Sequence, residues 1–194
     1  IKNQPLKRDK SKNIDTSIAE LRAYEFLVRQ QEAKEWIEEM VGEKLPPGTA
    51  NFCDNLRDGV ILAKLAKLFD PQSVTKIHMS TGTVLKFMAV DNIAKFLQAC
   101  RNIHLPSIYL FEITDLWELK GVPKVVSCLH TLANFLAQNG KAIKMKNLEA
   151  AGLKFDKEEL ERAWRDLEEM DNSGSPVVFT SMSSSGDDDE DDEK

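Results

Sequence analysis

Apolar residues recur at helical spacing along most of this chain, and no stretch alternates convincingly between apolar and polar residues. Steps of three and four residues join Val90, Ile93, Leu97 and Cys100, and such steps place side chains on one face of a helix. The main helices predicted in this way cover about residues 17–41, 59–69, 86–103 and 123–139. Because a strand needs alternation with a period of two, the pattern predicts an all-helical fold. We expect a compact bundle of four main helices plus short helices.

Several residues have predicted structural roles in this bundle. Asp58, Asp91 and Asp115 lie where helices are expected to begin, and a carboxylate there can accept hydrogen bonds from unpaired N–H groups. Trp36 and Trp117 are interpreted as bulky core residues. The central helix is expected to bury Leu56, Leu62 and Leu65.

The two ends of the chain differ in composition from its middle. The first thirteen residues hold five basic side chains and one acidic one, Asp9, so we predict a flexible basic arm at 1–16. That arm is either solvated or in contact with an acidic partner. After Met170 the sequence turns to Ser, Gly, Asp and Glu, which predicts a disordered tail at 171–194. The folded domain is expected at 17–140, and an extension with a docked helix at 141–170.

The extension carries one further helix signal. Asp156 is followed three residues later by Glu159, a pattern typical of a helix N-terminus. The predicted apolar face holds Leu160, Ala163, Trp164 and Leu167. A helix of this length is marginal by itself, so we expect Trp164 to dock it on the domain.

The net charge of -6 belongs to the tail, because residues 187–194 hold seven acids and one lysine. The other residues hold 25 basic and 25 acidic side chains, so nothing in the bulk charge favours nucleic acid.

The three cysteines, Cys53, Cys100 and Cys128, form no CxxC pair and are expected to be free, buried thiols in a cytosolic protein. No apolar run suits a membrane helix or a signal peptide, so no membrane insertion is expected. The first residue is Ile1, which suggests a fragment of a longer protein.

No motif in the chain predicts catalysis. His78, His104 and His130 lie in different segments without a companion carboxylate motif, and His130 is expected at or near the surface. The sequence has no Walker loop, HExxH or GxSxG motif, and its cysteines lack zinc-ligand spacing. We therefore expect a protein that is not an enzyme and that binds no cofactor and no metal.

Four segments carry one pattern in one order. They are 32–37 (EAKEWI), 55–65 (NLRDGVILAKL), 90–97 (VDNIAKFL) and 114–120 (TDLWELK) with the helix at 125–136. Together they resemble a calponin-homology domain, a module that grips actin filaments. The resemblance spans about residues 24–140 and implies the calponin-homology fold, here with an additional C-terminal helix.

A closer resemblance is to the single N-terminal calponin-homology domain of IQGAP scaffold proteins, and the expected source is fungal. It rests on 24–27 (YEFL), 45–47 (LPP), 105–106 (LP) and 128–132 (CLHTL), besides the segments above. Such a relative implies a cytokinetic-ring scaffold that binds and cross-links actin.

The resemblance also implies where a filament would bind. It points to Gln31, Lys34 and Glu35 in the first helix and to Lys120, Pro123, Lys124 and Val126 around the start of the last domain helix. Val126 is the expected apolar anchor, and the lysines are expected to steer association with acidic actin. For any single lysine ordinary solvation is the favoured interpretation, whereas the cluster as a whole favours the interface. Lys141, Lys144 and Lys146 either extend this basic face or interact with the dipole of the preceding helix.

The leading hypothesis is therefore an actin-filament-binding domain at the actin cytoskeleton and contractile ring. Two alternatives stay open. The first is a signalling adaptor that binds a kinase, calmodulin or a myosin light-chain-like protein. The second is a microtubule-binding module of the same fold.

Overall fold

The computed structural model describes residues 8–45, 52–79 and 86–173. Every regular element within these ranges is a helix, which confirms the predicted all-helical fold. The longer helices are α1 (Arg8–Val41), α3 (Val60–Phe69), α4 (Lys86–Asn102), α6 (Val122–Gln138) and α7 (Lys157–Ser173). The short ones are α2 (Phe52–Leu56), α5 (Ile113–Trp117) and the 3-10 turns η2 (Pro71–Ser73), η3 (Ser107–Tyr109) and η4 (Glu149–Ala151).

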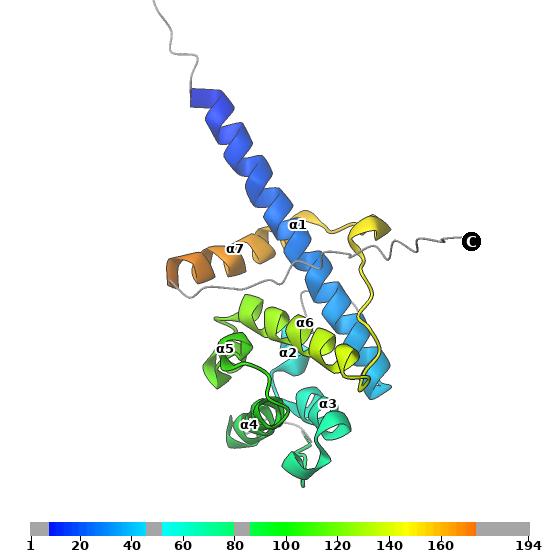
Figure 1. Cartoon of the computed structure of the whole chain (residues 1–194). Coiled ribbons are helices and arrows are strands. Elements are labelled where there is room, and N and C mark those ends of the chain that lie inside the picture. Colours follow the sequence, from blue (N-terminus) through cyan, green and yellow to red (C-terminus); the bar gives the residue numbers. More distant parts are fainter. Residues whose placement is uncertain (1–7, 46–51, 80–85, 174–194) are drawn as a thin grey trace, which may run out of the picture.

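The most extensive helix contacts are those of α3 with α4 and of α1 with α7. Within the body of the molecule α3 packs mainly against α4, while α1 contacts α3, α6 and α7 (Figure 1). The predicted core residues Leu56, Leu62 and Leu65 are fully buried, and Trp36 is almost so. Trp117 is only partly buried, with the Arg57 guanidinium carbon 5.1 Å from the centre of its ring.

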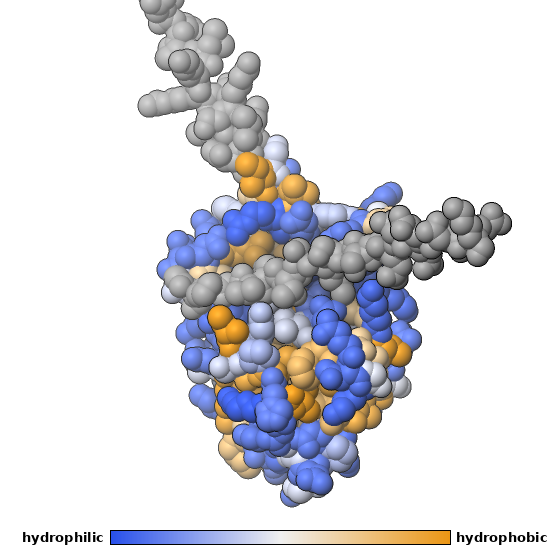
Figure 2. Space-filling view, viewed as in Figure 1, coloured by the Kyte–Doolittle hydropathy of each residue, from blue (hydrophilic) through white to orange (hydrophobic). Residues whose placement is uncertain are grey.

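Helix α1 begins earlier than its sequence predicts. It starts at Arg8 rather than near Ser17, so residues 8–16 of the expected basic arm form its first turns. No proline or glycine lies between Arg8 and Ser17 to interrupt a helix. The part of α1 that leaves the body is lined by apolar side chains where it emerges (Figure 2), and Ile18 and Leu21 of this part are more than half exposed. Residues 1–7 of the arm and the predicted tail from 174 onward lie outside the described residues.

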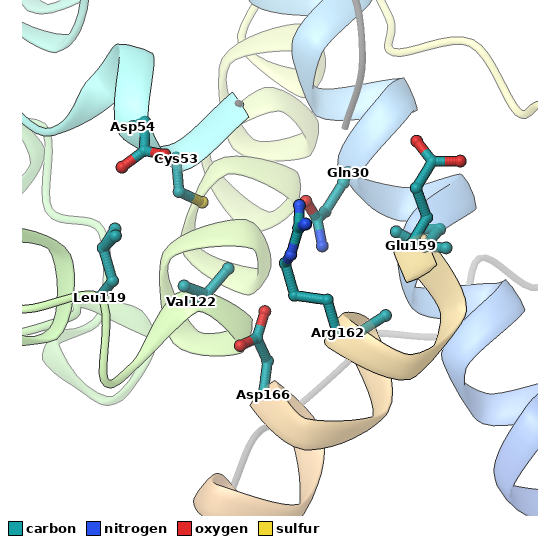
Figure 3. A pocket seen from close by; sticks show the side chains of 10 residues that line it. Gln30, Cys53, Asp54, Leu119, Val122, Glu159, Arg162 and Asp166 are labelled. Atoms are coloured by element: carbon teal, nitrogen blue, oxygen red, sulfur yellow. The ribbon is translucent and has the colours of Figure 1, made fainter. Parts of the chain in front are cut away.

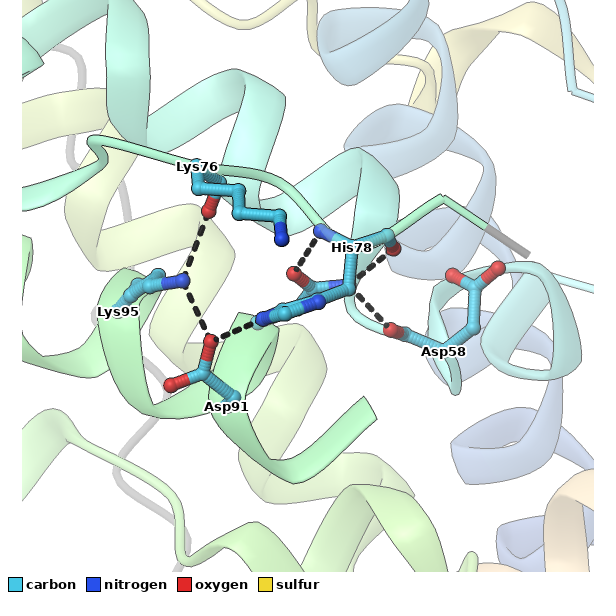
Figure 4. A network of polar contacts seen from close by, with 6 residues as sticks. Asp58, Lys76, His78, Asp91 and Lys95 are labelled. Atoms are coloured by element: carbon cyan, nitrogen blue, oxygen red, sulfur yellow. Dashed lines mark hydrogen bonds and ion pairs between the residues drawn. The ribbon is translucent and has the colours of Figure 1, made fainter. Parts of the chain in front are cut away.

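A buried amide joins α3 and α4 at Gly59. Gly59 has a φ of +70°, and Asn92 faces it from α4. The Asn92 Nδ2 donates to the backbone oxygens of Asp58 (3.0 Å) and His78 (2.9 Å), and its Oδ1 accepts from the His78 N–H (3.0 Å) (Figure 4). One fully buried side chain thus satisfies three backbone groups of two loops.

Two of the three predicted caps are found near helix starts. The Asp58 Oδ1 accepts from the N–H of Val60, the first residue of α3. Asp115 is the third residue of α5, and Glu112 is the residue before the helix. The Asp115 Oδ2 accepts a hydrogen bond from the Glu112 N–H, as in a capping box.

The prediction that Asp91 caps a helix is wrong, because Asp91 lies inside α4. Its carboxylate bonds Lys95 one turn later and lies 2.9 Å from the His78 ring (Figure 4). The hydrogen bond from Lys95 lowers the pKa of Asp91 most, and His78 adds to the effect. The helix predicted at 86–103 already began five residues before Asp91, and α4 does begin at Lys86, so Asp91 lies too far along the helix to cap it.

Helix α7 packs along α1, and Trp164 is not its main contact. The predicted start is confirmed by reciprocal hydrogen bonds of 2.9 Å between Asp156 and Glu159. The residues of α7 that are buried are Ala163, Leu167 and Met170. Trp164 is 43% exposed and borders a groove with Ala19 and Ala23 of α1, so it lies at the edge of the contact and not at its centre as expected. It is one residue, about 100°, away from the stripe that faces α1.

All three cysteines are free and buried, as predicted. None of the helices within the described ranges is long and apolar enough to span a membrane.

Candidate functional site

The predicted site residues of α1 line an open groove beside the C-terminal half of that helix. Gln31, Lys34 and Glu35 share its wall with Lys44 and Lys146, and the groove has a volume of about 540 Å³. The Gln31 amide donates to Glu35 at 2.9 Å, and Lys34 is 7% exposed. The structure therefore brings these three predicted residues to one groove, where Lys34 is buried and offers little surface to a filament.

The charges of this groove are nearly balanced, because four glutamates and three lysines line it. Lys44 Nζ lies 2.7 Å from Glu38 and Lys146 Nζ lies 3.3 Å from Glu39. Burial favours the neutral form of Glu38, but the hydrogen bonds from Lys44 and from the Leu45 N–H outweigh it and lower the pKa of this carboxyl. The groove alone is therefore not the positive patch expected from the sequence.

The segment after α6 lies against α1 next to this groove. The Trp36 Nε1 donates to the backbone oxygen of Ile143 at 3.1 Å, and the Leu148 N–H donates to the Glu32 carboxylate at 2.7 Å. Two long-range hydrogen bonds thus fix residues 143–148 on α1. No periodic pattern in the sequence indicates this placement.

This segment presents both charge and apolar surface. Lys141 and Lys144 are exposed and form no ion pair with any described residue, while the Ile143 side chain is 40% exposed. Lys146 reaches from the same segment into the groove. We refer to the α1 surface as the area formed by Gln31, Lys34 and Glu35 of α1 and by Lys141, Ile143, Lys144 and Lys146.

The predicted lysines near α6 have other neighbours. Lys120 is exposed and pairs with Glu118 at 2.8 Å, and Lys124 is partly buried, 3.4 Å from Asp115. Since Asp115 also caps α5, Lys124 has a structural partner in the domain. These residues lie around the α5–α6 junction and do not line the α1 groove.

The two predicted apolar contacts of this region are buried. Pro123 lies in the first turn of α6 and Val126 is completely inaccessible. The prediction of Val126 as an exposed anchor is therefore wrong. Helix α6 contacts α1, α5 and α7. These neighbours cover the side of α6 that carries Val126, besides its main apolar face.

Comparison with known proteins identifies this fold. The sequence profile of the calponin homology (CH) domain matches residues 27–138. The chain belongs to the calponin-homology domain family. Its relatives include IQGAP-type proteins, among them fungal ones.

The CH domain is 46% identical over 122 residues to the Ras GTPase-activating-like protein rng2 of Schizosaccharomyces pombe, covering 63% of this chain and 8% of that protein. It is 37% identical over 153 residues to human IQGAP2, covering 75% of this chain and 10% of that protein. The chain thus spans about a tenth of the length of these curated relatives. It also matches the crystal structure of the calponin-homology domain of Rng2 with a TM-score of 0.70 and 39% identity, covering 84% of this chain and 96% of that one.

The CH domain holds His130 in its interior, whereas the sequence placed it at or near the surface. The ring is 6% exposed between α6 and α1, and its Nε2 lies 3.0 Å from the Arg29 backbone oxygen and 3.8 Å from Glu32. Burial lowers the pKa of His130 to about 4, against the effect of that hydrogen bond. A neutral ring that donates its Nε2–H to Arg29 is the form that fits this site. Within the described residues, no cluster of His, Cys, Asp and Glu could hold a metal ion.

This burial predicts an acid-sensitive domain. The pKa of His130 is below its unfolded value of about 6.5, so its stabilising contribution is complete above that value. The contribution is lost as the pH falls through 6.5 toward 4, because the unfolded chain then binds the extra proton. Between pH 7 and pH 5 we expect His130 to remove about 2 kcal/mol from the free energy of unfolding.

The variant His130→Gln tests this, since the glutamine amide can still donate to Arg29. Urea unfolding at pH 7 and pH 5 should show a smaller loss of stability in the variant than in the wild type. Equal losses in both proteins would assign the acid sensitivity to other groups.

Proposed function

We propose that this CH domain binds actin filaments as the non-enzymatic binding module of an IQGAP-type scaffold. The observation that carries the proposal is the match to the Rng2 domain over 96% of its length, together with the profile match at 27–138. Filament binding is the function that the calponin-homology resemblance implies for such a module. By the same reasoning we propose a cytoskeletal role in assembly of the contractile ring.

We propose the α1 surface as the site of contact. Its unpaired lysines, Lys141 and Lys144, supply positive charge that is not already neutralised within the described residues, and acidic filaments attract such charge. Ile143 lies between them and offers an apolar contact of the kind that carries most of the affinity in an interface. Lys120 is exposed but paired, so we place it at most at the rim of the interface.

The alternative partners receive less support from the described residues. A calmodulin-like protein typically binds a basic amphipathic helix. Helix α7 is amphipathic, but its sequence holds seven acidic and three basic residues. We therefore do not extend the proposal to calmodulin, to myosin light-chain-like proteins or to microtubules.

The variant Ile143→Asp tests the proposed site. It places a carboxylate on the α1 surface, opposite an acidic partner, and should weaken filament binding at least tenfold, or about 1.4 kcal/mol. Lys144→Glu should weaken it by a smaller factor, and this loss should shrink as salt is added. Both side chains are exposed enough for the variants to fold.

The matched control is Lys67→Glu, which makes the same charge change at an exposed position in α3. Affinities would be measured by co-sedimentation with a fixed amount of actin filaments. If Lys67→Glu weakens binding as much as Lys144→Glu, only net charge matters and the proposed site is wrong. If Ile143→Asp binds like the wild type, the α1 surface is not the interface.

A further inference from the structure

A second pocket lies where α7 closes over α1, α2 and the start of α6 (Figure 3). It has a volume of about 310 Å³, enough for one large side chain but not for a folded segment. Leu27 and Val122 contribute apolar walls, while its polar lining comes from Gln30, Asp54, Glu159, Arg162 and Asp166. None of these residues belongs to the α1 surface.

Gln30 is the feature of this pocket that points to a ligand. Its side chain is 5% exposed and lines the pocket, yet it forms no hydrogen bond with any residue in the described part of the chain. A primary amide has two donor hydrogens and an acceptor oxygen. The two amide atoms are not sealed from solvent, so they stay open to a group that enters the pocket with matching donors and acceptors.

The charges around Gln30 define the sign of that group. Asp54, Glu159 and Asp166 bring three carboxylates to the lining, against the single guanidinium of Arg162. Glu159 already accepts the Asp156 N–H, whereas Asp166 forms no ion pair with a described residue. Burial, with Glu169 nearby, raises the pKa of Asp166 to about 6, although Arg162 and Arg165 act in the opposite direction.

We propose that this pocket binds the side chain of an arginine that a protein partner presents. The guanidinium is planar and carries five donor hydrogens, so it can bond the Gln30 oxygen and the Asp166 carboxylate together. The apolar walls suit the methylene stem of the same side chain. The shape and charge of the pocket thus select a long cationic side chain over an anion or an apolar one.

The first test uses the wild-type chain and a blocked amino acid as the probe. N-acetyl-arginine amide would be titrated into the ¹⁵N-labelled protein, with the Gln30 side-chain amide signals followed by NMR. Saturable shifts of these signals are expected, together with shifts of the backbone signals around Asp166. N-acetyl-citrulline amide has nearly the same shape without the charge and should bind at least tenfold more weakly. Absence of saturable shifts, or equal binding of the two probes, would overturn the proposal.

Two variants of α7 test whether the arginine probe binds in this pocket. Asp166→Asn removes the carboxylate charge with little change in size and should weaken the arginine probe at least tenfold. Glu158→Gln makes the same kind of change at an exposed position of α7 outside the pocket, and should leave binding unchanged. Equal losses in both variants would show that only the overall charge of α7 matters, which contradicts a site in the pocket. A blocked lysine that binds as tightly as the blocked arginine would contradict the assignment to a guanidinium.

Discussion

Replacing Gly59 with valine is expected to cost the domain about 4 kcal/mol of its free energy of unfolding, from backbone strain and overpacking together. Gly59 adopts a φ of +70°, where a β-branched residue is a genuine outlier. A Cβ at this position would lie 2.7 Å from the Asn92 Cβ and 2.8 Å from the Ile93 backbone nitrogen, so α4 would have to move. That movement would disturb the three hydrogen bonds of Asn92 as well.

The control for this prediction is Gly140→Val. Gly140 has a similar φ of +66°, but a Cβ there meets nothing within 4 Å. We expect about 2 kcal/mol of destabilisation from backbone strain alone. Urea unfolding followed by circular dichroism measures both variants. Equal losses at the two glycines would show that crowding between α3 and α4 contributes nothing.

Truncation of Trp36 to alanine is the second large effect that we expect. The side chain is 2% exposed, and removing a buried tryptophan costs about 4 kcal/mol through lost burial and the cavity that remains. The substitution also removes the hydrogen bond to the Ile143 backbone oxygen. The core and the α1 surface are thus linked through one residue.

Trp36→Phe separates these two contributions. It keeps most of the buried ring but cannot donate to Ile143, so we expect a stability loss of about 1 kcal/mol for the hydrogen bond itself. Because the 143–148 segment is then held less firmly, filament affinity should fall several-fold in a domain that is still folded at 25 °C. Calorimetry and co-sedimentation on one sample would measure both. Unchanged affinity with reduced stability would mean that the segment does not take part in binding.

The main helices are evident in the sequence because their apolar stripes are long and periodic. Val125, Leu129, Leu132 and Leu136, which form the predicted stripe of α6, are all completely buried. The burial of Val126 could have been predicted in the same way. Val126 is four residues after Val122 and three before Leu129, which are both buried, so helical spacing places all three on one apolar face.

In the candidate site, helical spacing predicts which residues of α1 lie together, but it does not predict which distant segment packs beside them. Gln31, Lys34 and Glu35 share one helix, so their common location follows from helical spacing. The contribution of Ile143 depends on a hydrogen bond between residues 107 positions apart. The spacing of Lys141, Lys144 and Lys146 was a signal for a basic face, but nothing nearby in the sequence showed that this segment packs on α1.

The most direct test of the proposed function is co-sedimentation of the wild-type chain with actin filaments at low and at physiological salt. We predict saturable binding at both salt concentrations, with a lower affinity at the higher one. The reason is that Lys141 and Lys144 contribute charge to a surface that also holds the apolar Ile143. Binding that saturates but does not respond to salt would contradict the role of Lys141 and Lys144. No sedimentation of the domain at either concentration would contradict filament binding by this chain.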